Sequence, residues 1–120
     1  MSDQAGRAWH FYVDDMLAFV QKAIDYTAEL DRARFSSDSL RRDATLRNLE
    51  LLGEAASRIP ADIRTLHADI PWRQMIATRN RLIHAYLGID DDVIWSIVRD
   101  ELPGLLERLQ TLRDASDGQN

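Results

Sequence analysis

The stretch IPWRQMIATRNRLIHAYLGID, residues 70–90, combines the apolar spacing of an amphipathic helix with a polar C-terminal half. Its apolar side chains recur at three- and four-residue steps, which places them on one face of a helix. Pro71 suits the first helical turn, where its missing N–H is not needed, and Gly88 suits a helix end. The stretch therefore predicts a helix that begins near Pro71 and ends before Gly88. The inward line is Trp72, Met75, Ile76, Leu82 and Ile83.

The polar half of this helix gathers two guanidiniums, an amide, an imidazole and a phenol within eight residues. They belong to Arg79, Asn80, Arg81, His84 and Tyr86. At about 100° per residue, Arg79 lies on the apolar line, where an unpaired guanidinium is costly. Arg79 must therefore either reach a carboxylate or face a cleft. Arg79 and His84 stand about 140° apart on an ideal helix, so they converge on one atom only if the helix loosens near His84.

Upstream of this helix, the segment RNLELLGEAASR, residues 47–58, carries two carboxylates one helical turn apart. Either Glu50 or Glu54 could pair with Arg79 if the two helices lie side by side. The alternative is that both glutamates belong to a solvated helix face.

The rest of the chain also has helical periodicity, and no alternating apolar pattern indicates a strand. Ser37 or Asp38 is expected to cap a second helix, and Asp90 or Asp91 a last one. Pro103 falls inside the last helix, where it should cause a kink or cost about 3 kcal/mol. The expected helices cover residues 9–31, 39–58, 71–87 and 91–112, with a short connector after Pro60.

These elements predict an all-α fold, an up-down bundle of four long helices plus a short connector helix. The 120 residues suit one domain, and its apolar fraction of 45% suits a globular core. We expect the domain to span residues 9–112, between a flexible N-terminus at 1–8 and a flexible tail at 113–120.

Composition narrows the classes of function. The chain has no Cys, which excludes disulfides and Cys-based metal sites. Neither a secretory signal nor an apolar run of about 18 residues is visible, so a cytoplasmic protein is expected. A net charge of −5 argues against a broadly basic nucleic-acid coat, although it is compatible with a local basic cleft.

No metal or cofactor site is expected. His10, His67 and His84 are scattered along the chain, and the three aspartates at 90–92 fit a helix cap better than a metal site.

Three blocks in order resemble the HepT-like toxin family of the HEPN superfamily. They are RNLELLGEAA at 47–56, IPWRQMIATRNRLIHAYLGID at 70–90 and VIWSIVRDELPGLLERL at 93–109. The second block holds the family's Arg-x4-His-x-Tyr motif as Arg79, His84 and Tyr86. The resemblance runs from about Tyr12 to Leu112, nearly the whole chain.

This resemblance implies a HEPN-like helical bundle that homodimerises, and a metal-independent endoribonuclease with a composite site in the dimer. It implies the toxin of a type II toxin–antitoxin pair, neutralised by a cognate MNT-type nucleotidyltransferase. Arg79 and His84 would be the catalytic pair and Asn80 a supporting residue. The antitoxin would attach AMP to Tyr86, although a Tyr on the apolar line could equally be a core residue.

The chemistry of these residue types fits RNA cleavage. RNA carries its own nucleophile, the 2′-OH, and histidine can move a proton near neutral pH. A fixed arginine can offset charge on the phosphate oxygens. Further arginines are candidate RNA contacts, with solvated surface charge as the alternative: Arg41, Arg42, Arg47, Arg73 and Arg81. A second hypothesis is a non-catalytic helical module that only binds a nucleotidyltransferase, because kinship of fold does not establish activity.

Overall fold

The computed structural model describes residues 8–85 and 88–118, and within these ranges it contains helices and no strand. The predicted all-α bundle with a short connector helix is confirmed. In chain order the elements are α1 (Trp9–Thr27), α2 (Arg32–Ser37), α3 (Ser39–Ser57), α4 (Ala61–Leu66), α5 (Trp72–Ala85), α6 (Asp91–Ser96), the π-helical turn η2 (Ile97–Glu101) and α7 (Leu102–Gly118).

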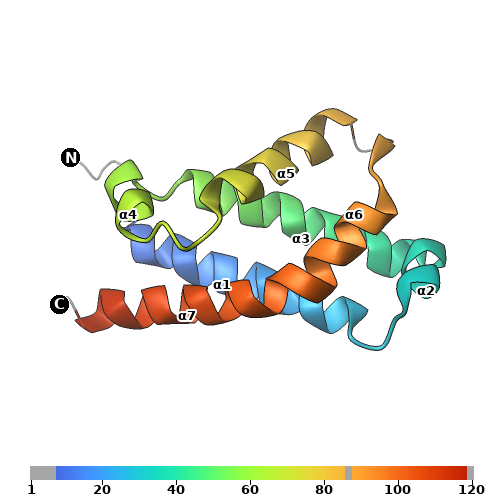
Figure 1. Ribbon diagram of the computed structural model, residues 1–120, viewed down its shortest axis with the longest axis horizontal. Helices are drawn as coiled ribbons and strands as arrows, with labels where there is room; N and C mark the ends of the chain where they lie inside the picture. The colour runs from blue at the N-terminus through green and yellow to red at the C-terminus, as the bar shows by residue number, and fades with distance from the viewer. Residues whose placement is uncertain (1–7, 86–87, 119–120) are drawn as a thin grey trace.

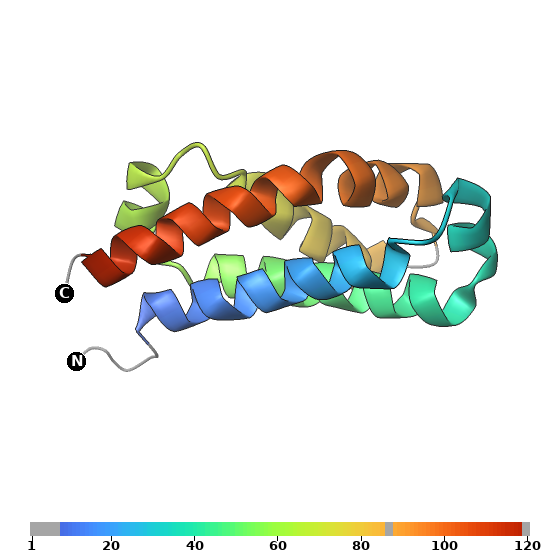
Figure 2. The same cartoon turned by 90° about the horizontal axis from the view of Figure 1, so that it is seen from below.

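The long helices form a bundle in which α3 lies between α1 and α5 (Figure 1). The last helix, α7, runs back alongside α1, so the start of α1 and the end of α7 lie at the same end of the molecule (Figure 2). α5 packs on α3 and slants so that its C-terminal end reaches the upper edge of the molecule in Figure 1. This slant presents the polar half of α5 at the surface.

The core follows the apolar stripes of the long helices. Its fully buried members include Val13, Met16, Val20, Ala56, Leu102, Leu109 and Leu112. On α3 the apolar side chain of Leu40 does not join the core and is 80% exposed, because Leu40 stands about 180° around the helix from Leu49. Thr45 and Asn48 take the inward positions instead, and their side chains donate to the carbonyls of Arg41 and Ala44.

The first helix ends earlier than its apolar pattern suggested. α1 stops at Thr27 rather than Asp31, and a separate short helix, α2, follows. Asp31 caps α2 by accepting the N–H of Arg34 at 2.8 Å, and Phe35 from α2 is fully buried. The cap and the buried ring together stabilise a helix too short to be recognised by periodicity. Asp38, one of two expected caps, accepts the N–H of Arg41 at 3.0 Å and begins α3.

The last long helix bends at the π-helical turn η2, between α6 and α7 (Figure 1). There the N–H of Leu102 donates to the carbonyl of Ile97, one residue beyond α-helical spacing. Pro103 follows directly, and a proline lacks the N–H and crowds the carbonyl one turn earlier. The wider turn is the local form of the predicted kink.

α7 continues to Gly118, beyond its expected end near Leu112. Ser116 is buried and Arg113 forms an ion pair with Asp14 of α1 at 2.6 Å, which holds the added turns against the bundle. The expected flexible N-terminus, residues 1–8, lies outside the described residues except for Ala8. Within residues 8–85 and 88–118, none of the helices has the length and hydrophobicity that a membrane span requires.

Candidate functional site

Arg79 lies where α5 crosses α3, and the crossing depends on a glycine. A Cβ added at Gly53 would stand 2.3 Å from the Cβ of Arg79 and 2.6 Å from the carbonyl oxygen of Met75. Neither distance is possible between non-bonded atoms, so only glycine permits this approach of the two helices. The first carbons of the Arg79 side chain therefore run across the bare backbone of α3.

The guanidinium of Arg79 pairs with Glu54, the residue that follows this glycine. Nη2 of Arg79 lies 2.6 Å from Oε1 of Glu54, and Arg58 donates to Oε2 of the same carboxylate at 3.0 and 3.2 Å. Glu50, the other candidate, pairs with Arg47 at 3.1 Å. Of the two expected alternatives for Arg79, a carboxylate partner or a cleft, the structure shows the carboxylate partner.

Asn80 holds the guanidinium from a second side. Its Oδ1 accepts from Nη1 of Arg79 at 2.9 Å, while Nε of Arg79 is buried and has no acceptor among the described residues. The Arg79 side chain stays 30% exposed. This arrangement orients the guanidinium in advance and leaves part of it accessible to an anion.

His84 is exposed near the end of α5, and its imidazole has no hydrogen-bond partner within the described part of the chain. α5 remains α-helical through Ala85, so the loosening that convergence of Arg79 and His84 would require is absent up to that residue. In a single chain, His84 and Arg79 therefore point in directions about 140° apart. Tyr86 lies outside the described residues.

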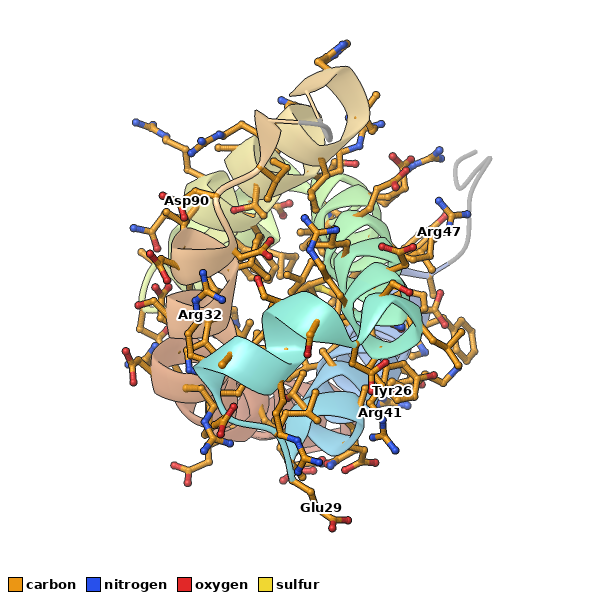
Figure 3. All side chains as sticks on the ribbon, turned by 90° about the vertical axis from the view of Figure 1, so that its right-hand side faces the viewer. Tyr26, Glu29, Arg32, Arg41, Arg47 and Asp90 are labelled. Atoms are coloured by element: carbon orange, nitrogen blue, oxygen red, sulfur yellow. The ribbon has the colours of Figure 1, made fainter. Side chains whose placement is uncertain are left out.

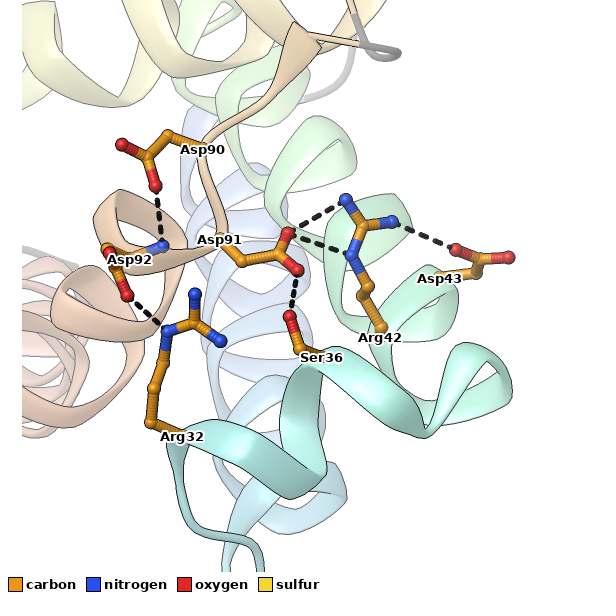
Figure 4. Close-up of polar contacts among 7 residues, drawn as sticks. All are labelled: Arg32, Ser36, Arg42, Asp43, Asp90, Asp91 and Asp92. Atoms are coloured by element: carbon orange, nitrogen blue, oxygen red, sulfur yellow. Dashed lines mark hydrogen bonds and ion pairs between the residues drawn. The ribbon is translucent and has the colours of Figure 1, made fainter.

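Three of the candidate RNA-binding arginines are engaged within the chain. Arg41 donates to the carbonyl of Tyr26 at 3.0 Å (Figure 3), and Arg47 pairs with Glu50. Nε and Nη2 of Arg42 each lie 2.8 Å from Oδ1 of Asp91 (Figure 4). By contrast, Arg73 and Arg81 are exposed and have no ion-pair partner among the described residues.

Asp91 and its neighbours fasten α6 to α2 and α3 (Figure 4). Asp90 caps α6 by accepting the N–H of Asp92 at 2.8 Å, while Asp91 accepts from Ser36 and Arg42, and Asp92 pairs with Arg32. The hydrogen bond from Arg42 lowers the pKa of Asp91, and the same contact raises the pKa of Arg42. Within the described residues, no three His, Asp or Glu side chains are grouped to hold a metal ion.

Two residues of this site, Gly53 and Arg58, were not predicted from the sequence. The sequence contained a signal for each of these residues. Gly53 is a glycine in the interior of a strongly helical segment, which often marks a close packing contact. Arg58 stands four residues after Glu54, the spacing of an ion pair along one helix.

Comparisons of the sequence with known proteins agree on one family. The profile of a family described as Ribonuclease HepT-like matches residues 16–112. A Thermococcus cleftensis protein named "Probable ribonuclease HepT" is 37% identical over 102 residues, which cover 85% of this chain and 93% of that protein. A Methanocaldococcus jannaschii protein with RNase in its name is 33% identical over 99 residues, 82% of this chain and 91% of its own length. No solved structure gives a significant match.

Proposed function

Because the chain belongs to the HepT-like ribonuclease family, we propose that it is a cytoplasmic RNase toxin in which Arg79 and His84 cleave RNA. The observation that carries this assignment is the oriented, part-exposed guanidinium of Arg79, held by Glu54 and Asn80 on the helix that also carries His84. Such a guanidinium is a preorganised binder of phosphate oxygens.

In the proposed reaction the 2′-oxygen of RNA bonds to the adjacent phosphorus while the bond from phosphorus to the 5′-oxygen breaks. One proton leaves the 2′-OH and another reaches the departing 5′-oxygen. His84 moves these protons, since imidazole exchanges them near neutral pH. Arg79 offsets the charge that develops on the phosphate oxygens, and Asn80 keeps its guanidinium in place. No metal or other cofactor takes part in this scheme.

We assign the complete site to a homodimer. Along one α5, Arg79 and His84 diverge, so a single chain does not direct both at one phosphate. A two-fold axis near the ends of α5 would bring His84 from each copy to opposite sides of one cleft. Ile83, beside His84, was expected on the inward line but is 41% exposed, and it would then be covered by the second copy.

We further propose that a cognate nucleotidyltransferase antitoxin neutralises the protein by transferring AMP to Tyr86. The proposal is supported by the position of Tyr86, two residues after His84 in the family motif. An AMP group adds bulk and negative charge, which would repel the phosphate of RNA. Tyr86→Phe should retain RNase activity and escape neutralisation on co-expression. Full silencing of this variant, with no AMP on the wild-type tyrosine by mass spectrometry, would contradict the assignment.

The competing function is a non-catalytic module that binds the nucleotidyltransferase. One observation favours it: the guanidinium of Arg79 already forms an ion pair with Glu54 in the free chain. The two candidate functions are distinguished by incubating the purified protein with RNA in EDTA and mapping the RNA ends. We expect cleavage by the wild type and by His67→Ala, a histidine remote in sequence from the motif. Loss is expected for His84→Ala and Arg79→Ala. Absence of cleavage by the wild type would favour the module.

A further inference from the structure

A second basic feature lies at the other end of α5 from His84. There a hollow of about 670 Å³ opens between α4, the connecting loop and the first turns of α5. This volume is within the usual range for sites that take small ligands or parts of larger ones. Its charged lining residues are Arg64, Arg73 and Asp69. We call this feature the α4–α5 hollow.

The two arginines of the α4–α5 hollow differ from most others in the chain. Arg64 is partly buried, and its Nε is shielded from solvent without an acceptor. Within the described ranges neither Arg64 nor Arg73 has an ion-pair partner, whereas seven other arginines are paired with carboxylates. Those seven are Arg32, Arg41, Arg42, Arg47, Arg58, Arg79 and Arg113. A partly desolvated guanidinium without a partner is unfavourable, so an external anion would be stabilising here.

The α4–α5 hollow shares a face of α5 with the proposed catalytic end. At 100° per residue, Arg73, Asn80 and His84 fall within about 40° of one another, and all three are exposed. Arg73 precedes His84 by eleven residues, which is about 17 Å along the helix. A stacked strand carries one phosphate per roughly 3.4 Å, so about five phosphates span this distance. One RNA strand can therefore lie along this face from the hollow to His84.

We propose that Arg64 and Arg73 form a phosphate subsite that holds single-stranded RNA several nucleotides from the bond that is cut. This inference rests on the proposed ribonuclease function. It supplies a local RNA-binding region to a chain whose net charge is −5. Contacts to phosphate position a strand without reading its bases, so the subsite confers dependence on substrate length rather than on sequence.

The binding test uses single-stranded DNA of roughly twelve nucleotides, long enough for this face, which lacks the 2′-OH and is not cut by the proposed chemistry. Affinity is measured across a salt series for the wild type, Arg64→Gln, Arg73→Gln and the double variant. Each lost phosphate contact should reduce the slope of log affinity against log salt by about 0.7, and both together by about 1.4. Arg34→Gln is the matched control, because Arg34 is exposed on α2, at the opposite end of the molecule from α4 (Figure 1).

The kinetic test compares an RNA of the same length with a dinucleotide. The double variant should raise KM for the long RNA by roughly tenfold with little change in kcat, and should cleave the dinucleotide as the wild type does. Any of three results would overturn the subsite. In the first, the salt slopes of the arginine variants equal that of the wild type. In the others, the double variant affects both substrates equally, or it loses antitoxin binding while DNA binding stays intact. Cleavage of RNA by the wild type tests the ribonuclease function separately, since it needs neither variant.

Discussion

Gly53 is the residue on which the position of Arg79 most directly depends. Gly53→Ala would set a methyl group against the backbone of α5, which cannot yield without moving the helix. We expect a loss of about 1–3 kcal/mol in the free energy of unfolding, partly offset by the better helix propensity of alanine. RNA cleavage should fall as well. Urea unfolding and a cleavage assay measure the two effects.

Gly104→Ala is the matched control for this substitution. Gly104 also lies inside a helix, but a Cβ there meets nothing within 4 Å. The same change should therefore be neutral or stabilise the protein by up to about 1 kcal/mol. Equal stabilities of the two variants would show that the close crossing of α3 and α5 does not constrain the fold.

Glu54 positions Arg79 and does not itself touch RNA in the proposed scheme. Glu54→Gln keeps the shape of the side chain but removes the charge that holds Nη2 of Arg79. Because the pair is partly exposed, stability should change by less than about 1 kcal/mol. Misplacement of Arg79 should lower kcat by roughly 10- to 100-fold.

Glu50→Gln, one turn earlier on α3, removes the same charge from a pair that does not involve Arg79. It should leave kcat near the wild-type value. A pH–rate profile adds a further check, because a purely structural defect would lower the rate equally at every pH. If both glutamine variants have the same rate, Glu54 has no special positioning role.

How far the site follows from sequence also differs from residue to residue. The place of Arg79 on the apolar line predicted that it would reach a carboxylate or face a cleft, and it pairs with the carboxylate of Glu54. The choice of Glu54 over Glu50 depended on the position along α3 at which α5 crosses it, and Gly53 sets that position. The pairing of Arg42 with Asp91 joins residues 49 apart, so no local pattern could reveal it.

At the scale of elements, α6 is held to α2 and α3 by the carboxylate of Asp91. The hydrogen bond from Arg42 holds the pKa of Asp91 below its ordinary value of 3.8. Because the folded pKa is depressed, this contribution to stability is complete above pH 3.8 and is lost as the pH falls through the lower folded value. Asp91→Asn should therefore flatten the decline of stability in this acidic window.

This prediction is measured by urea unfolding at a series of pH values below about 5. Asp43→Asn is the control, because Asp43 also approaches Arg42, at 3.4 Å, but is 73% exposed. Its pH profile should match that of the wild type. If the stability of Asp91→Asn declines with falling pH as steeply as that of the wild type, the ion pair contributes nothing to the docking of α6.

The elements themselves were predictable where a local signal marked their ends. α3 was expected over residues 39–58 and spans Ser39–Ser57, because Asp38 caps its start and Pro60 follows its end. The end of α1 carried no Gly or Pro, and the break into α2 depends on a buried Phe35. The bend near Pro103 was foreseen, but its form as a π turn depends on how α6 and α7 each pack.

At the scale of the whole molecule, the proposed site requires two chains. Sedimentation of the pure protein at micromolar concentration should give about twice the chain mass of 13.8 kDa. Ile83→Glu, a charge on the exposed residue beside His84, should shift the population toward monomer and lower cleavage together. Val93→Glu is the control, as Val93 is similarly exposed, at 43%, but lies on α6. A wild-type monomer that still cleaves RNA would rule out the shared site.

The packing of α7 against α1 has a consequence for synthesis on the ribosome. Among the described residues, α1 is the first helix and α7 the last, and the ion pair of Asp14 with Arg113 joins residues 99 apart. The stripe of α1 that α7 covers therefore stays open until this 17-residue helix has been made. A nascent chain cannot close this bundle before α7 has been made. Assembly of an active enzyme therefore waits until α7 has emerged from the ribosome.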